Sequence, residues 1–258
     1  MEAETRVRGL DTMADGLNLE QADTDGLVAV SAALGDQPRL RGALSDPALR
    51  GDERAQLAAT LLSGRVSAKV AELVGAAAAR SKGPSDLEAL VERIAIRAVL
   101  QHDGEIDAVA EELFRFARTV EADPRLQVTL TDPRVDLAAR QELVDTLAST
   151  KVRPQTLALI HRALAVRGRP LVKTLDSYVE LAALVQASTI ARVSVARPLT
   201  ADQLARIKAQ LVRIYGVAID VRVDVDPEVL GGVRIEVGDE IIDGTIQTRL
   251  NQARRLIG

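Results

Sequence analysis

The sequence has no cysteine and no tryptophan, and its remaining aromatic residues are Phe114, Phe116, Tyr178 and Tyr215. Without cysteine, disulfides, zinc–thiolate sites and a cysteine nucleophile are all excluded. Apolar residues still make up 47% of the chain, and Ala, Leu and Val supply most of them. This composition favours thin, closely packed helices over a pocket lined with aromatic rings.

Long apolar runs and charge of one sign are missing too. No segment reaches the roughly 18 consecutive apolar residues of a membrane-spanning helix, and the N-terminus lacks the basic and then apolar pattern of a signal peptide. The net charge is −4, with positive and negative residues interleaved rather than gathered in the basic stripe typical of nucleic-acid-binding proteins. We therefore expect a soluble intracellular protein with no nucleic-acid partner.

Motifs for catalysis or ligand binding are equally scarce. The two histidines, His102 and His161, lack a His-x-x-x-His partner, and we interpret them as polar groups on helix surfaces. Gly231-Gly232 is not followed by the Lys-Ser or Lys-Thr of a phosphate-binding loop, which favours a turn or a bulge. We interpret the adjacent carboxylates Glu111 and Glu112 as solvated charge. The sequence therefore predicts no catalytic residue, no metal site and no cofactor.

What the sequence does contain is an internal repeat with an offset of 86 residues. The matched segments include 38–40 with 124–126, 44–47 with 130–133, Leu27 with Leu113, and Arg54 with Arg140. The match needs no gap as far as Pro84, which falls on Pro170. Self-similarity over a whole supersecondary unit implies two similarly folded modules.

Apolar residues at helical spacing predict that each module is a bundle of short helices. One stripe in the second module comprises Ile106, Val109, Leu113, Phe116 and Val120. Its helix ends at Asp123, because a residue before proline is pushed out of the helical region. A further helix, from about Asp86 to Gln101, lies at the seam, where the repeat makes it the last helix of the first module.

Beyond Ser188 the pattern changes to strands. Alternating residues predict strands at 190–195, 217–225 and 233–237, with a helix around Leu204 to Ile214 after the first. Ile241-Ile242 resumes an apolar run after Gly238-Asp239, as in a tight hairpin, and Asp243 can cap a helix from about Thr245. We expect a three-stranded sheet with two helices, a β-α-β-β-α unit.

The predicted fold is therefore mainly α with a small α+β C-terminal domain. We divide the chain into a first helical module (1–86), a second helical module (87–187) and the C-terminal domain (188–258).

The segment GGVRIEVGDEIIDGTIQTRL, from Gly231 to Leu250, resembles the C-terminal end of the delta subunit of F-type ATP synthases, called the oligomycin-sensitivity-conferring protein in mitochondria. The resemblance continues upstream through Ser188 to Gly216 and, more weakly, to about residue 87. Typical members of that family carry one helical bundle, so the first module is an addition, similar to the longer actinobacterial forms. By the family pattern, the seam helix opens the second module.

The resemblance implies a non-catalytic stator subunit, present in one copy on the cytoplasmic face of the membrane and attached to it only through the complex. In that family the helical bundle holds the N-terminal helices of the alpha subunits, and the C-terminal domain holds the end of subunit b. Resistance to rotational torque then couples proton flow to ATP synthesis. The competing interpretations are a helical-repeat adaptor unrelated to ATP synthase and an enzyme with a small β-α-β domain.

Two sets of residues are candidates for these contacts. For the alpha N-terminus we predict a groove, here called the predicted groove, formed by Ile94, Ala95, Ala98, Leu157, Ile160 and Leu164, where small residues would let a partner helix lie close. The alternative is that most of Leu157, Ile160 and Leu164 belongs to the module core. For subunit b we predict Leu250, Ala253, Leu256 and Ile257, since apolar residues at a chain end fray unless docked. The alternative is that the sheet and its helices bury each other completely.

Overall fold

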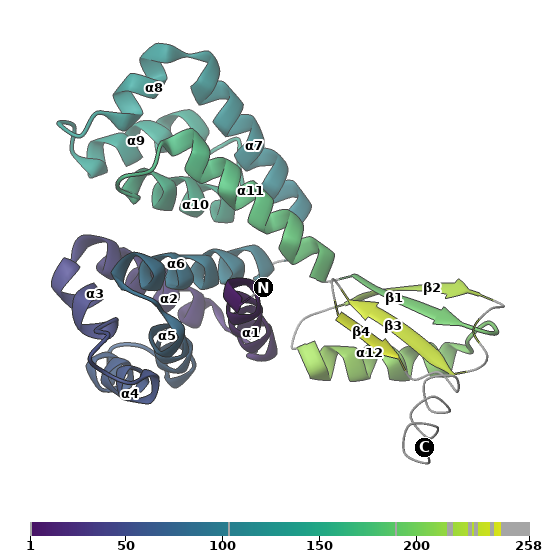
Figure 1. Ribbon diagram of the computed structural model, residues 1–258. Helices are drawn as coiled ribbons and strands as arrows, with labels where there is room; N and C mark the ends of the chain where they lie inside the picture. The colour runs from purple at the N-terminus through teal and green to yellow at the C-terminus, as the bar shows by residue number, and fades with distance from the viewer. Residues whose placement is uncertain are drawn as a thin grey trace. The chain divides into compact units, whose positions relative to one another are not determined.

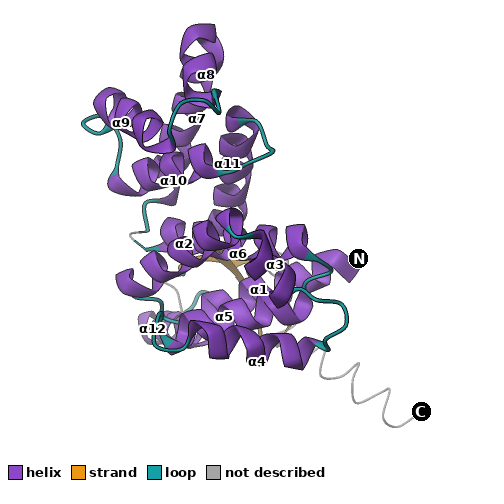
Figure 2. Ribbon diagram, turned by 90° about the vertical axis from the view of Figure 1, so that its left-hand side faces the viewer, coloured by secondary structure: helices purple, strands orange, loops and turns teal. Residues whose placement is uncertain are grey.

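The computed structural model describes residues 2–102, 104–188, 190–215, 219–226, 229, 232–237 and 240–243. The chain divides into two compact units, Met1–Ala183 and Leu184–Gly258, each taken here by itself. Helices build the first unit (Figures 1 and 2), and the strands among the described residues belong to the second (Figure 1). This arrangement confirms the predicted fold class, mainly α with a small α+β part at the C-terminal end.

The first helical module comprises α1 (Glu2–Gly16), α2 (Gln21–Asp36), α3 (Pro38–Leu44), α4 (Gly51–Leu62), α5 (Ala68–Arg80) and α6 (Pro84–Gln101). The second comprises α7 (Ile106–Ala122), α8 (Pro124–Thr131), α9 (Leu137–Ala148), α10 (Pro154–Ala165) and α11 (Leu171–Ser188). Proline occupies the first position of α3, α6, α8 and α10, where its missing N–H costs no helical hydrogen bond. Asp123 caps α8 by accepting hydrogen bonds from the backbone N–H groups of Arg125 and Leu126.

The helix boundaries follow the repeat. Helix α9 begins 86 residues after α4 and has the same length of 12 residues, and α10 begins 86 residues after α5. The last helix departs from this register, because α11 begins 87 residues after α6. Pro84 is the first residue of α6, whereas Pro170 precedes α11 and its carbonyl accepts the first helical hydrogen bond, from Thr174 N at 2.9 Å. The sequence match itself needs no gap up to Pro170, and only the first helical residue differs, by one position.

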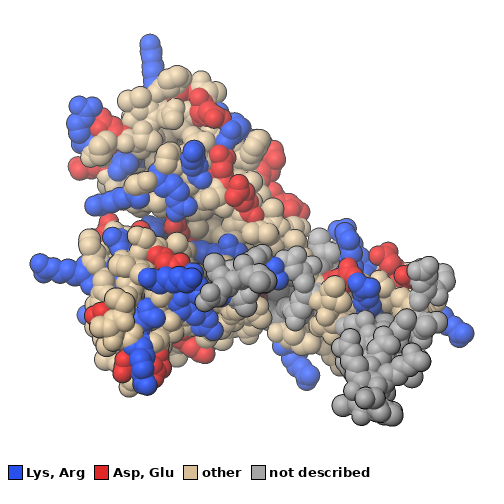
Figure 3. Space-filling model, in the orientation of Figure 1, with Lys and Arg blue, Asp and Glu red and all other residues tan. Residues whose placement is uncertain are grey.

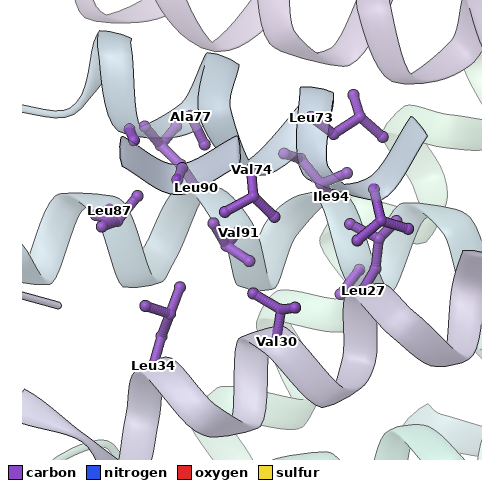
Figure 4. Packing of buried hydrophobic residues seen from close by; sticks show 14 of the residues in the cluster. Leu27, Val30, Leu34, Leu73, Val74, Ala77, Leu87, Leu90, Val91 and Ile94 are labelled. Carbon is purple, nitrogen blue, oxygen red and sulfur yellow. The ribbon is translucent and has the colours of Figure 1, made fainter. Parts of the chain in front are cut away.

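Helix α6 is buried on two opposite faces. Eleven of its 18 residues are buried, and successive residues are about 100° apart around a helix. One face carries Leu87, Val91 and Ile94, which pack against Leu27, Val30 and Leu34 of α2 in the core of the first module (Figure 4). This face closes the first module, as the repeat predicted.

The opposite face of α6 carries Ile96, Val99 and Leu100, which are buried but do not belong to the core cluster of the first module. Glu92 lies on the same side of the helix, and its carboxylate accepts a hydrogen bond from the hydroxyl of Tyr178 in α11. This face therefore opens the second module. One helix thus contacts both modules.

The second unit contains β1 (Ile190–Val195), α12 (Ala201–Tyr215), β2 (Asp220–Val225), β3 (Val233–Val237) and β4 (Glu240–Asp243). Among the described residues they form a four-stranded sheet in the order β2-β1-β3-β4. Strands β1 and β2 are parallel, which requires a crossover, and α12 supplies it. The other neighbouring pairs are antiparallel.

The expected three-stranded sheet was wrong by one strand. Ile241 and Ile242 pair with Glu236 and Ile235 of β3, so the second half of the predicted hairpin is a full member of the sheet. The pairing register places Val193 beside Val223 and Ile235 on one face. That apolar face packs against α12, while Arg192, Arg222 and Glu236 lie side by side on the other face. The helix expected from Thr245 lies outside the described residues.

Candidate partner-binding surfaces

The seam helix carries a buried carboxylate that joins it to the second module. Glu92 is 5% exposed and accepts hydrogen bonds from Tyr178 Oη at 2.6 Å and from Arg169 Nη2 at 2.8 Å. Burial, and then the negative charge of Glu92, raise the pKa of the Tyr178 hydroxyl well above its usual range. The hydroxyl therefore stays protonated and remains a hydrogen-bond donor. This network fixes α11 against α6.

A second set of polar contacts joins α6 to α1. Arg93 Nη2 lies 2.7 Å from Asp11 Oδ2, and Arg97 Nη2 lies 2.6 Å from Asp15 Oδ2. Gln101 donates a further hydrogen bond to Asp15 at 2.8 Å. Because the partners advance together along both helices, α1 runs parallel to α6. The Arg97 side chain is only 3% exposed, so loss of Asp15 would leave a buried charge with less compensation.

A third contact joins the two modules through α10. Arg162 of α10 is buried, and its Nη2 approaches the carbonyl oxygen of Ser31 in α2 at 3.5 Å. Nearby, Arg41 of α3 forms an ion pair with Glu88 of α6 at 2.8 Å. Gly35 of α2 lies close to the Glu88 carboxylate and to the Arg162 guanidinium. A Cβ at Gly35 would be 3.5 Å from Glu88 Oε1 and 4.0 Å from the nearest guanidinium nitrogens of Arg162. Helices α2, α6 and α10 therefore meet at the seam.

The structure does not assemble the predicted groove as one open surface. On α6, Ile94, Ala95 and Ala98 are 0%, 2% and 5% exposed and belong to the core of the first module. On α10, Ile160 and Leu164 are buried and Leu157 is half-buried, and none of the three belongs to that core. Ile160 and Leu164 are thus buried as the alternative of a core position would have them, and the three residues of α6 are buried as well. Binding of a partner helix at these residues stays a prediction, and it would require the modules to open.

The physical reason lies in the two faces of α6. The resemblance places this helix in the second module, and the groove was predicted on its residues Ile94, Ala95 and Ala98, which lie in the core of the first module. The first module covers that side of α6 with α2. The exposed apolar positions of the second module include Phe114 of α7 and Val128 of α8, which are 47% and 64% exposed. Neither was singled out from the sequence, because Phe114 lies outside the apolar stripe of its helix and Val128 follows no periodic pattern.

Glu112 corrects another expectation, because this carboxylate is buried rather than solvated. It accepts hydrogen bonds from the backbone N–H of Arg153 at 2.9 Å and from Thr156 Oγ1 at 2.6 Å, and the Arg153 guanidinium donates to it as well. Burial acts to raise the pKa of Glu112, but these hydrogen bonds and the charge of Arg153 outweigh it and hold the pKa below its usual value. The carboxylate therefore stabilises the N-terminal end of α10. Glu111, its neighbour, is exposed as expected.

Comparison with known proteins identifies the family. A family model described as the ATP synthase delta (OSCP) subunit matches residues 94–257. A protein named ATP synthase subunit delta from Kineococcus radiotolerans is 39% identical over 99% of this chain and 94% of its own length. Proteins of the same name from Streptomyces avermitilis and a Parafrankia species are 39% and 40% identical over 95% and 89% of this chain. The chain belongs to the ATP synthase delta (OSCP) subunit family.

Within this delta-family chain, the family model begins at Ile94, in the middle of α6. The first five helices precede the match, yet the relatives named above align with nearly the whole chain, including these helices. The first module is therefore shared with those delta subunits.

The residues predicted to hold subunit b, Leu250, Ala253, Leu256 and Ile257, lie outside the described part of this delta-family chain. In the described part of the C-terminal unit, the apolar side chains that remain exposed include Val225, Ile241 and Ile242, at 49%, 55% and 37%. They lie on β2 and β4, the two edge strands of the sheet. The sheet and α12 thus leave part of their apolar surface uncovered.

The remaining polar groups of the delta-family chain form contacts between neighbouring helices or lie at the surface. The described residues contain no group of three potential metal-ligating side chains. His161 of α10 lies 2.9 Å from Asp145 of α9, a contact between two neighbouring helices. None of the described helices is long and apolar enough to cross a membrane. Basic and acidic side chains alternate over the visible face in Figure 3, as the interleaved sequence predicted.

Proposed function

We propose that this delta-family protein is a peripheral-stalk, or stator, subunit of a proton-translocating F-type ATP synthase. It links the alpha subunits of the catalytic head to subunit b and resists the torque that rotation applies to the head. The observation that carries this proposal is the family membership, which spans the second module and the C-terminal unit and extends to relatives named ATP synthase subunit delta along nearly the whole chain.

The partner contacts are assigned to three parts of the chain, residues 1–86, 87–187 and 188–258. The helical modules hold the N-terminal helices of the alpha subunits, and the C-terminal domain holds the end of subunit b. Two observations support the second assignment. Apolar side chains on both edges of the sheet remain exposed, and the chain continues beyond β4 with the apolar residues Leu250, Ala253, Leu256 and Ile257.

In this assignment the protein catalyses no reaction and binds no cofactor. It is present as one copy per complex. It sits at the cytoplasmic face of the membrane and meets the lipid only through its partners. Its interleaved surface charge supports protein partners over nucleic acid. The alpha subunits and subunit b are the partners that this assignment requires.

Affinity purification from native membranes tests the proposal. A tag at the N-terminus of the full chain should recover alpha subunits, subunit b and ATPase activity together. A matched preparation lacking residues 251–258 should still recover the alpha subunits but lose subunit b. Recovery of unrelated proteins, with neither alpha nor b present, would favour the helical-repeat adaptor instead. Recovery of b by the truncated chain would move the b contact away from the C-terminal end.

A further inference from the structure

The first module has a structural relation to the second that the sequence repeat alone does not specify. The repeat makes α1 the counterpart of α6, so each module could have been a separate bundle with its own first helix. Instead, α6 contributes one buried face to each module. Leu87, Val91 and Ile94 lie in the core of the first, while Ile96 and Leu100 lie on the opposite side of the helix.

Polar contacts also join α6 to both modules. Glu92 binds Tyr178 and Arg169 of the second module, while Arg97 on the same helix pairs with Asp15 of the first. All of these groups except Arg169 are buried. Separation of the modules would therefore expose both an apolar face and charged groups whose partners remain behind.

The outer side of α1 contrasts with the seam. The positions of α1 that correspond to Ile94, Ala95 and Ala98 are Arg8, Gly9 and Thr12, and all three are exposed. A Cβ added at Gly9 would meet no other atom within 4 Å. The apolar counterpart of this surface, formed by Ile94, Ala95 and Ala98, lies at the seam in the core of the first module.

We infer that the two helical modules form one cooperative unit, in which the first module braces the second through the shared helix α6 and cannot open independently of it. If either module unfolds, α6 loses the contacts on one of its two buried faces. The other face stays packed, so the helix remains folded while the uncovered apolar face is exposed to water. Unfolding of both modules together therefore requires less free energy than this partly unfolded state. This inference concerns the helical unit alone and holds whether or not the protein is a stator subunit.

Hydrogen exchange measured by mass spectrometry on the full chain tests the inference. Leu44 and Leu130 are equivalent in the repeat and are 1% and 0% exposed, and neither lies on α6. Leu44→Ala perturbs the first module and Leu130→Ala the second. In a cooperative unit, each variant should speed exchange of the slowest amides in both α5 and α10, by about thirtyfold or more, the factor that corresponds to loss of a buried leucine side chain.

Faster exchange confined to the mutated module, or no change in either, would overturn the inference. Leu147→Ala is the matched surface control, because Leu147 is 39% exposed, and it should leave exchange in both helices within about threefold. Should the leucine variants fail to fold, Val74→Ala and Ile160→Val offer a smaller change at another pair of repeat-equivalent positions, both 0% exposed. The same pattern, faster exchange in both modules, is required of them.

Discussion

Ala98→Glu is the substitution that most directly distinguishes an open groove position from a core position at Ala98. If Ala98 lined an open groove, the variant would fold normally and lose only the partner helix. In the structure Ala98 is 5% exposed within the core of the first module. A carboxylate there takes up a proton rather than stay charged, so its cost at pH 7 is limited by the gap of about 2.7 units to the ordinary glutamate pKa, or about 3.7 kcal/mol. The added volume costs about 1–3 kcal/mol more.

The expected loss, about 5–7 kcal/mol at pH 7, rivals the whole stability of a typical domain. Burial raises the folded-state pKa of the new carboxyl above its unfolded value, so the charge-related cost shrinks as the pH falls. At pH 5 that part should drop to about 1 kcal/mol. Urea denaturation of variant and parent protein, followed by circular dichroism at both pH values, measures the difference.

Thr12→Glu is the matched control, because Thr12 is the repeat-equivalent residue on α1 and is exposed. It should change the unfolding free energy by no more than about 0.5 kcal/mol. An unchanged denaturation midpoint for Ala98→Glu at pH 7, together with lost binding of a peptide from the alpha N-terminus, would refute the core assignment and restore the predicted groove.

Three further predictions follow from the same contacts. Leu113→Ala should lower the unfolding free energy by about 2–5 kcal/mol, since Leu113 is 0% exposed, and a loss below about 0.5 kcal/mol in the same denaturation assay would contradict its burial. The folded-state pKa of Glu112 is lowered, so its stabilisation is present above the unfolded pKa and is lost as the pH falls through the folded one; Glu112→Gln should flatten the stability profile on the acid side, and an unaltered profile would show that its contacts are not made. The purified chain should hydrolyse no ATP, and activity that persists through several columns and disappears with a point mutation in the chain would disprove this.

Helical periodicity predicted much of the second module correctly. Ile106, Val109, Leu113, Phe116 and Val120 form the stripe expected on α7, and the structure buries all five. The reason is physical, because a helix with one apolar stripe has one way to face a core. The rule that a residue before proline leaves the helical region placed Asp123 at the end of α7, where it caps α8. Local rules were sufficient wherever one face or one cap decided the outcome.

The seam and the sheet required information that local patterns do not carry. Apolar residues surround α6, which indicates burial on more than one side but does not say which module covers which face. Glu112 looked like solvated charge because its partners, Arg153 and Thr156, lie more than forty residues later in the chain. The fourth strand was missed because only Ile241 and Ile242 supply its apolar signal. Long-range pairing decides each of these cases, and the family resemblance supplied the function but not these contacts.

The shared helix also has a consequence for how proteins of this design can grow or shrink. Because α6 is the last helix of one bundle and the first of the next, a period of 86 residues adds five helices rather than six. Loss of one period between α1 and α11 would join α1 directly to α7 and leave a single six-helix bundle. That shortened protein would keep the polar outer face of α1 at its N-terminal end. A length change that keeps both buried faces of the shared helix covered therefore adds or removes a whole period of 86 residues.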